Sequence, residues 1–236
     1  MQQGKIYLIP STLGDTETEL VLPSSVHQII NTIDHYIVEE IRHARRFLKK
    51  LNIVKPIDEL TFVEMKGKLN YGDITKILLL TREGKNVGVI SEAGVPCIAD
   101  PGAEIVNLAH QKNIAVMPMV GPSSILMALM GSGMNGQNFA FTGYLPKERK
   151  DRIQRIRQLE NIANSQKQTQ LFMDTPYRNN HVLEDLLQTC SSTTQLCIAV
   201  ELTLPTQMIK TKSIKEWKAN PLDLNKRPCI FIIGSL

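Results

Sequence analysis

The sequence predicts an α/β protein with two domains, a doubly wound parallel sheet in the first and a mixed α/β layer in the second. Segments of β-forming residues alternate with segments of helical periodicity through the first half of the chain. Beyond Gly133 the pattern of expected strands and helices changes, and two expected strands within residues 196–214 are spaced like a hairpin. We therefore place the N-terminal domain at residues 1–135 and the C-terminal domain at residues 136–236, with a ligand cleft between them.

The first domain opens with a strand at Lys5–Pro10, a short run of β-forming residues that a proline ends. The helix expected at Arg42–Leu51 carries apolar residues every three or four positions and basic residues on its other face. The remaining elements are a helix from Ser24 to about Thr32, a strand at Tyr36–Val38, a helix from Asp73 to Thr81, a strand at Asn86–Ile90, a helix at Ala103–Gln111, a strand at Ile114–Met119 and a helix that ends near Gly131.

The second domain is expected to start with a strand and a strongly charged helix. Its elements are strands at Phe139–Leu145, Gln170–Met173, Leu196–Leu202, Met208–Ile214 and Cys229–Ile233, and helices at Glu148–Asn164 and Asn180–Gln188.

Composition excludes several classes of protein. The sequence has no stretch of about 20 apolar residues and no secretory signal, so we expect a soluble, cytoplasmic protein with no membrane partner. The four cysteines and five histidines form no cluster with the spacing of a metal site, and no metal is expected. A net charge of +4 is too small to indicate a nucleic-acid partner by itself.

Four loops at the predicted carboxyl ends of strands hold the candidate site, because ligands of open α/β sheets bind there. The loops contain Pro10–Gly14, Glu39–Arg42, Ser91–Gly102 and Gly121–Ser124. Small residues allow close approach of a ligand to the backbone, and carboxylates accept hydrogen bonds from hydroxyl, amino or cationic groups. Each loop alone could be an ordinary turn, but four in register indicate a polar cofactor pocket.

Other ligand classes fit less well. The first strand is followed neither by the glycine pattern of dinucleotide sites nor by the phosphate-binding pattern that ends in Lys and Ser or Thr. Nicotinamide and nucleoside triphosphates are therefore disfavoured. A magnesium site built from Glu39, Glu40, Glu92 and Asp100 is a weaker alternative.

Motifs along nearly the whole chain resemble one family. The segments are Gly4–Pro10 with Leu13-Gly14, Val38–Leu48, Val89–Gly102, Val120–Ser124 with Gly131–Gly133, Gly143–Lys147, Asp174–Arg178 and Val200–Thr203. Together they resemble the tetrapyrrole methylase family, in the branch that methylates small-subunit ribosomal RNA. Val89–Gly102 is the most specific match. The chain departs from the pattern at Glu40, Ile41, Glu92 and Thr175–Arg178, and Val63–Gly67 stands where a histidine-rich motif is expected.

The resemblance implies that S-adenosyl-L-methionine binds between the two domains and that its methyl group passes to a cytidine ribose 2′-hydroxyl of ribosomal RNA. It implies a homodimer as well. Carried over by motif, the cofactor-binding residues would be Pro10, Ser91, Glu92, Ala93, Gly94, Ile98, Ser123, Ser124 and Met173, with Pro228 and Cys229 near the adenine.

Candidate catalytic residues are Glu39, or its neighbour Glu40, as a base and Arg42 or Lys147 as partners of a phosphate or oxyanion. Glu39 and Arg42 could instead form a local ion pair at the start of a helix.

Two basic faces are candidate RNA contacts, although charged faces are often merely solvated. One holds Arg42, Arg45, Arg46, Lys49 and Lys50; the other holds Lys147, Arg149, Lys150, Arg152, Arg155 and Arg157. A methyltransferase for a tetrapyrrole or another small molecule, and a non-catalytic module that binds the cofactor or RNA, remain as alternatives.

Overall fold

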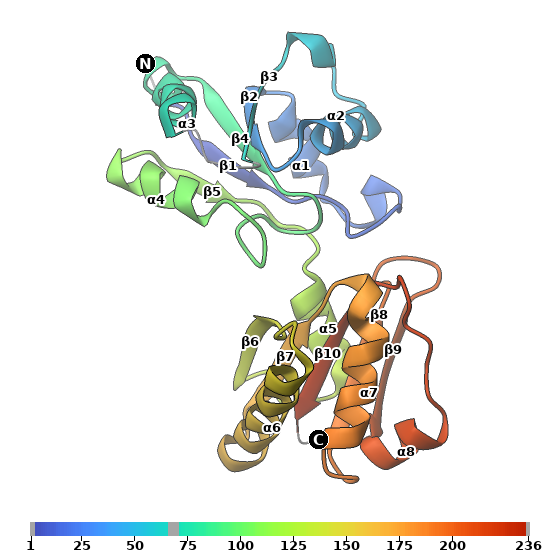
Figure 1. The fold of residues 1–236 in the computed structure, drawn as a ribbon. Coiled ribbons are helices and arrows are strands. Elements are labelled where there is room, and N and C mark those ends of the chain that lie inside the picture. The colour runs from blue at the N-terminus through green and yellow to red at the C-terminus, as the bar shows by residue number, and fades with distance from the viewer. Residues whose placement is uncertain (1–2, 66–70, 235–236) are drawn as a thin grey trace. The chain divides into compact units, whose positions relative to one another are not determined.

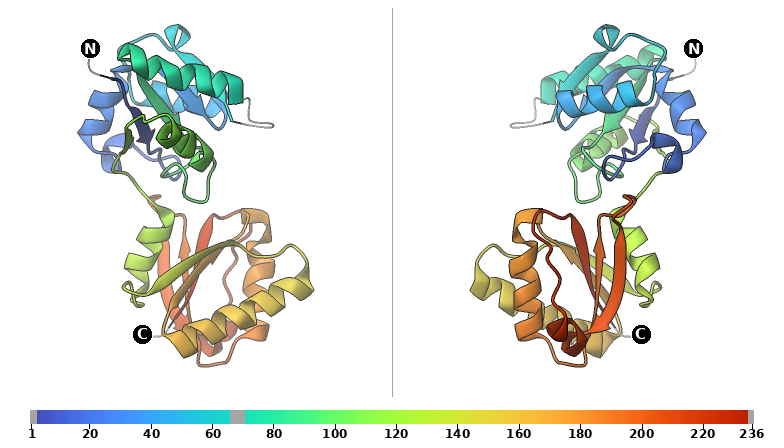
Figure 2. Two further views of the ribbon diagram at one scale, coloured as in Figure 1. Left: turned by 90° about the vertical axis from the view of Figure 1, so that its left-hand side faces the viewer. Right: turned by 90° about the vertical axis from the view of Figure 1, so that its right-hand side faces the viewer.

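Two five-stranded sheets organise the protein in a computed structural model, which describes residues 3–65 and 71–234 (Figure 1). The chain divides into two units, Met1–Ser123 and Ser124–Leu236, called unit 1 and unit 2 below. Each unit contains one sheet with helices packed on both of its faces (Figures 1 and 2).

Unit 1 is a doubly wound parallel sheet, as the alternating pattern predicts. The strand order is β3-β2-β4-β1-β5 and every neighbouring pair is parallel. Its strands are β1 (Ile6–Ile9), β2 (Ile33–Val38), β3 (Thr61–Glu64), β4 (Asn86–Ile90) and β5 (Val116–Pro118), and its α-helices are α1 (Ser24–Ile30), α2 (Ile41–Lys50), α3 (Tyr71–Leu79) and α4 (Ala103–Gln111).

Alternating side chains of these strands supply two separate cores. Ile6, Leu8 and Val89 pack with α3 and α4 on one face. Ile9, Tyr36 and Ile90 pack with α1 and α2 on the other. This alternation follows from the two-residue repeat of a strand, and it explains why the buried strands are apolar on both sides. All strands of a parallel sheet end at the same edge, so the loops after β1, β2, β4 and β5 are brought together.

Unit 2 is built on a mixed sheet of order β6-β7-β10-β8-β9, in which only β6 and β7 run parallel. Its strands are β6 (Phe139–Tyr144), β7 (Thr169–Met173), β8 (Gln195–Val200), β9 (Met208–Ser213) and β10 (Cys229–Gly234), and its α-helices are α5 (Ser124–Ser132), α6 (Arg149–Gln166), α7 (Asn179–Thr189) and α8 (Ile214–Ala219). The α6, α7 and α8 helices share one core with the sheet, and α5 packs against β8, β9 and β10.

The structure differs from the predicted organisation at three points. The chain divides after Ser123 and not after residue 135, because α5 packs on the sheet of unit 2. Strand β3 was not predicted, since its sequence Thr-Phe-Val-Glu is short and only half-buried at a sheet edge. The α8 helix was not predicted. It follows directly on β9 and is held by a capping box between Ser213 and Glu216.

Candidate functional site

The loops after β1 and β4 are hydrogen-bonded to each other at the carboxyl edge of the unit 1 sheet, and the loop after β5 packs closely against the β1 loop. The Ser11 amide donates to the Gly94 carbonyl oxygen at 2.8 Å, and the Ser11 hydroxyl donates to the Ser91 carbonyl oxygen at 3.4 Å. A Cβ on Gly121 would lie 2.2 Å from the Cβ of Pro10. A side chain at residue 121 would therefore push the β1 and β5 loops apart.

Gly94 is required by its backbone conformation as well as by its surroundings. Its φ is +72°, a region that L-residues with side chains rarely adopt. A Cβ there would lie 3.0 Å from Leu13 Cδ2 and 3.2 Å from the Pro122 carbonyl oxygen. Gly94 is thus fixed by the shape of the β4 loop, and its predicted contact with a cofactor stays a prediction.

Three carboxylates gather beside these loops, at the ends of β2 and β4. Glu39 Oε2 accepts a hydrogen bond from the Glu92 amide at 3.2 Å. Burial raises the pKa of Asp100 to about 6, and the neighbouring charges of Glu39 and, to a smaller extent, Glu92 act in the same direction. A site that gathers carboxylates in this way suits a ligand with positive charge.

A pocket of about 440 Å³ lies between these loops and α2. One wall carries small and acidic residues, including Ser11, Ser91, Glu92 and Ala93, and the opposite wall carries His43, Arg46 and Lys50. The pocket thus brings Glu92 of the β4 loop and three basic residues of α2 to one depression within unit 1, whereas Glu39 and Asp100 do not line it.

The predicted cofactor-binding residues of the first half are only partly brought together. Pro10, Ser91, Glu92, Ala93 and Gly94 share the loop edge just described. Ile98 is farther along the β4 loop, does not line the pocket and is 52% exposed. Ser123 closes unit 1, and Ser124 is the first residue of α5 in unit 2.

The four candidates of the second half share one end of the unit 2 sheet. Met173 ends β7 and is the register partner of Ile230, so Pro228 and Cys229 lie beside it at the start of β10. The Leu145 amide donates to the Met173 carbonyl oxygen at 3.3 Å, which places Lys147 at this end as well. Burial raises the pKa of the Cys229 thiol far above its usual range, so this cysteine is a packing residue and not a nucleophile.

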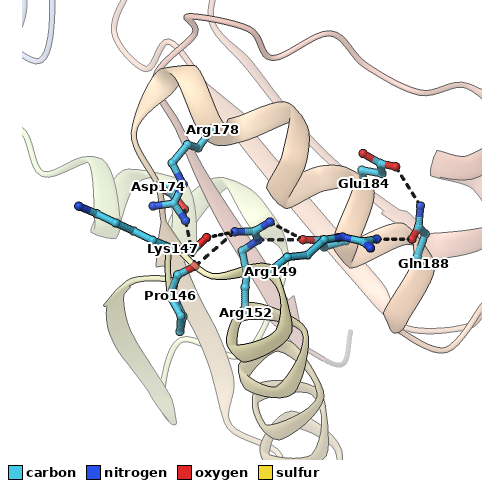
Figure 3. Close-up of polar contacts among 9 residues, drawn as sticks. Pro146, Lys147, Arg149, Arg152, Asp174, Arg178, Glu184 and Gln188 are labelled. Atoms are coloured by element: carbon cyan, nitrogen blue, oxygen red, sulfur yellow. Dashed lines mark hydrogen bonds and ion pairs between the residues drawn. The ribbon is translucent and has the colours of Figure 1, made fainter.

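Arginines hold the loops at this end of unit 2 (Figure 3). Arg178 donates to the Pro146 carbonyl oxygen at 2.9 Å and forms an ion pair with Asp174 at 3.1 Å. Arg152 donates to the Lys147 carbonyl oxygen at 2.8 Å and to Asp185 Oδ2 at 2.8 Å. The Lys147 side chain points away from this network and is exposed.

This network corrects the prediction that six basic residues of the second domain face RNA. Arg152 is 5% exposed and Asp185 is 1% exposed, so their ion pair belongs to the interior of the fold. Arg149 donates to the other oxygen of Asp185 at 2.9 Å and to Gln188 at 2.8 Å. Two of the six cations are therefore structural.

The catalytic candidates in unit 1 are separate and not paired with each other. Within the described residues, no ion pair joins Glu39 to Arg42. Glu39 is half-buried and held by the Glu92 amide, and Arg42 is exposed in the first turn of α2. The alternative of a local ion pair between Glu39 and Arg42 is therefore not formed among the described residues.

Sequence reasoning placed Asp100 and Ser11 in the candidate loops and Arg46 on a basic face, but it named neither these residues nor His43 as cofactor-binding or catalytic. Asp100 stands in the specific segment Val89–Gly102, which was the signal that could have found it. The other three line the pocket because α2 packs over the β1 loop, a contact that no local pattern predicts.

Metal sites and membrane-spanning helices are both absent from the described residues. No group of three or more His, Cys, Asp or Glu side chains there could hold a metal ion. No helix in this part of the chain is both long and apolar enough to cross a membrane.

Comparison with solved structures shows a shared fold. The chain superposes on the crystal structure of the methyltransferase CobJ with a TM-score of 0.64 and 17% identity, covering 98% of this chain and 94% of that one. For uroporphyrin-III-C-methyltransferase from Thermus thermophilus the TM-score is 0.56, the identity is 16% and the coverage is 98% and 94%.

Sequence comparison identifies relatives named ribosomal RNA small subunit methyltransferase I. The relative from Thermotoga maritima is 30% identical over 185 residues, which are 78% of either chain. The relative from Vibrio cholerae is 25% identical over 231 residues, 97% of this chain and 76% of the relative. The match to the Escherichia coli O157:H7 relative spans 66% of that relative's length.

The model of the family described as Tetrapyrrole (Corrin/Porphyrin) Methylases matches residues 6–218. This match runs from the first strand of unit 1 to the last helix of unit 2, so it includes the loop edge of one sheet and the arginine-held end of the other. The chain therefore belongs to the tetrapyrrole methylase family.

Proposed function

We propose that this protein transfers a methyl group from S-adenosyl-L-methionine to a ribose 2′-hydroxyl of small-subunit ribosomal RNA. The observation that carries the proposal is the unit 1 pocket, in which a loop of small and acidic residues faces a basic helix. One wall suits a cationic methyl donor and the other suits an anionic acceptor. The names of the relatives support RNA as that acceptor.

The residues present fit the methyl donor. S-adenosyl-L-methionine would supply an activated methyl group on a positively charged sulfur. Burial, together with the nearby charges of Glu39 and Glu92, raises the pKa of Asp100, and a cationic ligand beside these carboxylates would favour their charged forms. Gly94 and Gly121 let the β1, β4 and β5 loops pack closely together, and the exposed Ala93 lines the pocket with only a small side chain.

Residues of this chain would act mainly by holding the acceptor in line with the methyl carbon. Such positioning supplies a large part of the rate enhancement in a displacement. Glu39, fixed by the Glu92 amide, is the candidate that accepts the proton of the 2′-hydroxyl. Arg42 and Lys147 are candidates for neutralising a phosphate of the acceptor.

Unit 2 supplies the other candidate cofactor contacts. Met173, Pro228 and Cys229 share one end of its sheet, which supports a joint role. Ser123, Ser124 and Ile98 are retained as candidates on the resemblance of their motifs. We also propose that the protein acts as a homodimer in the cytoplasm, and light scattering of the purified protein tests the dimer.

The test combines binding with turnover in one preparation. Calorimetric titration with S-adenosyl-L-methionine is followed by transfer of labelled methyl to small-subunit particles, to free small-subunit RNA and to uroporphyrinogen. The proposal predicts binding and transfer to RNA or particles, with the label recovered as a 2′-O-methylated nucleoside. Transfer to uroporphyrinogen alone would replace RNA by a small-molecule acceptor. Absence of cofactor binding would contradict a methyltransferase.

A further inference from the structure

The α2 helix carries an unusual concentration of cations for its length. Its ten residues, Ile41–Lys50, include five Lys or Arg and no acidic residue in the first turn. Only Ala44 and Leu48 are fully buried, so the helix turns a narrow apolar stripe to the sheet and exposes the rest. The charge of this surface depends on which cations already have acidic partners.

Three cations near this surface are neutralised by acids of unit 1. Arg45 pairs with Asp58, Lys50 pairs with Asp15 at 2.7 Å, and Lys55 pairs with Asp34. Among the described residues, no salt bridge is found for Arg42, Arg46 or Lys49. These three are all exposed. They leave a surplus of positive charge on one side of the helix.

A second pocket, of about 600 Å³, lies where α2 meets the segment that follows it. It is lined by Arg45, Arg46, Lys49 and residues 52–57, and Val54 at its side is 86% exposed. Arg46 lines both this groove and the 440 Å³ pocket beside the β1 and β4 loops. The two depressions therefore adjoin through one unpaired guanidinium.

We infer that the phosphate backbone of the acceptor RNA lies along α2, from the basic wall of the pocket across Arg46 into this groove. The inference rests on the proposed function and specifies the surface that receives the substrate. Arg42 and Lys49 are seven residues apart, which is about 10 Å along a helix, so the unpaired cations can meet successive phosphates of one strand. The guanidinium of Arg46 can hold a phosphate in a forked contact.

Neutralising the two groove cations tests the inference. The double variant R46Q/K49Q is titrated with a labelled fragment of small-subunit RNA at several salt concentrations. Removing two phosphate contacts to a single strand should lower the slope of log affinity against log salt by about 1.4. If the affinities converge near 1 M salt, this difference is roughly 25-fold at 0.1 M.

The matched control removes the same charge elsewhere. Lys215 and Lys218 are exposed on α8, which begins directly after Ser213, the last residue of β9. Met208 is at the other end of that strand. The variant K215Q/K218Q should keep the RNA affinity and salt slope of the unchanged protein. An equal loss in both variants would show that only total charge matters, and it would overturn the inference.

Cofactor binding separates this inference from the proposed function. In R46Q/K49Q the calorimetric affinity for S-adenosyl-L-methionine should stay unchanged while RNA affinity falls. An unchanged RNA affinity in R46Q/K49Q would overturn the α2 path but leave methyl transfer intact. Loss of cofactor affinity in this variant would overturn the inference too, since Arg46 would then belong to the cofactor wall. Failure of the unchanged protein to bind cofactor would contradict the proposed function itself.

Discussion

Charged residues are used in opposite ways at the candidate ends of the two units. In unit 1, like charges gather: burial raises the pKa of Asp100, the charges of Glu39 and Glu92 add to this shift, and cations line the α2 helix beside the pocket. In unit 2, charges of opposite sign meet, as in Arg152 with Asp185 and Arg227 with Glu201. Gathered like charges cost stability unless a ligand neutralises them, whereas paired charges hold loops in place. The comparison assigns ligand binding to the first set and scaffolding to the second.

The largest expected effect comes from breaking the scaffold pair. D185A leaves Arg152 buried without its counter-charge, which costs about 3–5 kcal/mol. Trp217, the only tryptophan of the chain, lies in the unit 2 core, so its fluorescence during urea unfolding reports on this unit.

The apolar double variant R152M/D185L provides the control for D185A. Because no charge is left buried, this variant should recover much of the lost free energy of unfolding. A loss below about 1 kcal/mol in D185A would place the pair among ordinary surface contacts and would remove the contrast between the units.

The next effect concerns ligand affinity without a change in stability. Glu92 is exposed, so E92Q should alter the free energy of unfolding by less than about 0.5 kcal/mol. If its carboxylate contacts the positive charge of the cofactor, affinity for S-adenosyl-L-methionine should fall about 10- to 100-fold. Calorimetry measures both quantities.

Two controls sharpen the E92Q measurement. Affinity for S-adenosyl-L-homocysteine, which lacks the sulfonium charge, should fall less, whereas an equal fall would indicate a contact to a group that both ligands carry, the ribose hydroxyls or the α-ammonium. Glu17 is exposed outside the pocket, so E17Q should leave both affinities unchanged. Unchanged affinity in E92Q would remove this residue from the cofactor site.

The fold was largely predictable because strands and helices in unit 1 carry clear periodicity. The strand at Asn86–Ile90 and the helix at Ala103–Gln111 have the predicted bounds. The α8 helix was missed although Ser213 and Glu216 have the spacing of a capping box. Part of the motif compared at Val63–Gly67 lies outside the described residues.

The candidate site was predictable only where its residues share a loop. Ser91, Glu92 and Ala93 line the unit 1 pocket, and sequence reasoning could place them in one loop because they are neighbours in the chain. The ion pairs of Arg149 and Arg152 could not be predicted from sequence, since their partner Asp185 comes more than thirty residues later, in α7. A count of basic residues does not reveal which of them an acid in another helix neutralises.

A smaller effect follows from the raised pKa of Asp100. A carboxyl whose pKa is higher in the folded protein than in the unfolded chain favours folding when protonated, and this stability is lost as pH rises through about 6. D100N, which stays neutral, should therefore stabilise unit 1 at pH 8 by about 1 kcal/mol, after allowance for solvent screening, and by nothing near pH 4.

Differential scanning calorimetry of the unchanged protein and D100N at the two pH values measures this difference. A stabilisation of the same size at both pH values would show that the effect is not ionisation. A loss of stability at pH 8 would show that the Asp100 carboxylate has a favourable partner, and the contrast with Asp185 would then fail.

The smallest expected effect tests whether the remaining cations of α6 behave like those of α2. Lys150 and Arg157 are exposed on α6, the helix whose first two arginines, Arg149 and Arg152, donate hydrogen bonds to Asp185. The double variant K150Q/R157Q removes the same charge as R46Q/K49Q. If α6 is a scaffold helix with a solvated face, RNA affinity at 0.1 M salt should change by less than about threefold and the salt slope by less than about 0.3. A change in the salt slope close to that expected for R46Q/K49Q would instead show that RNA has a second contact on unit 2. The scaffold role would then apply only to the buried arginines of that unit.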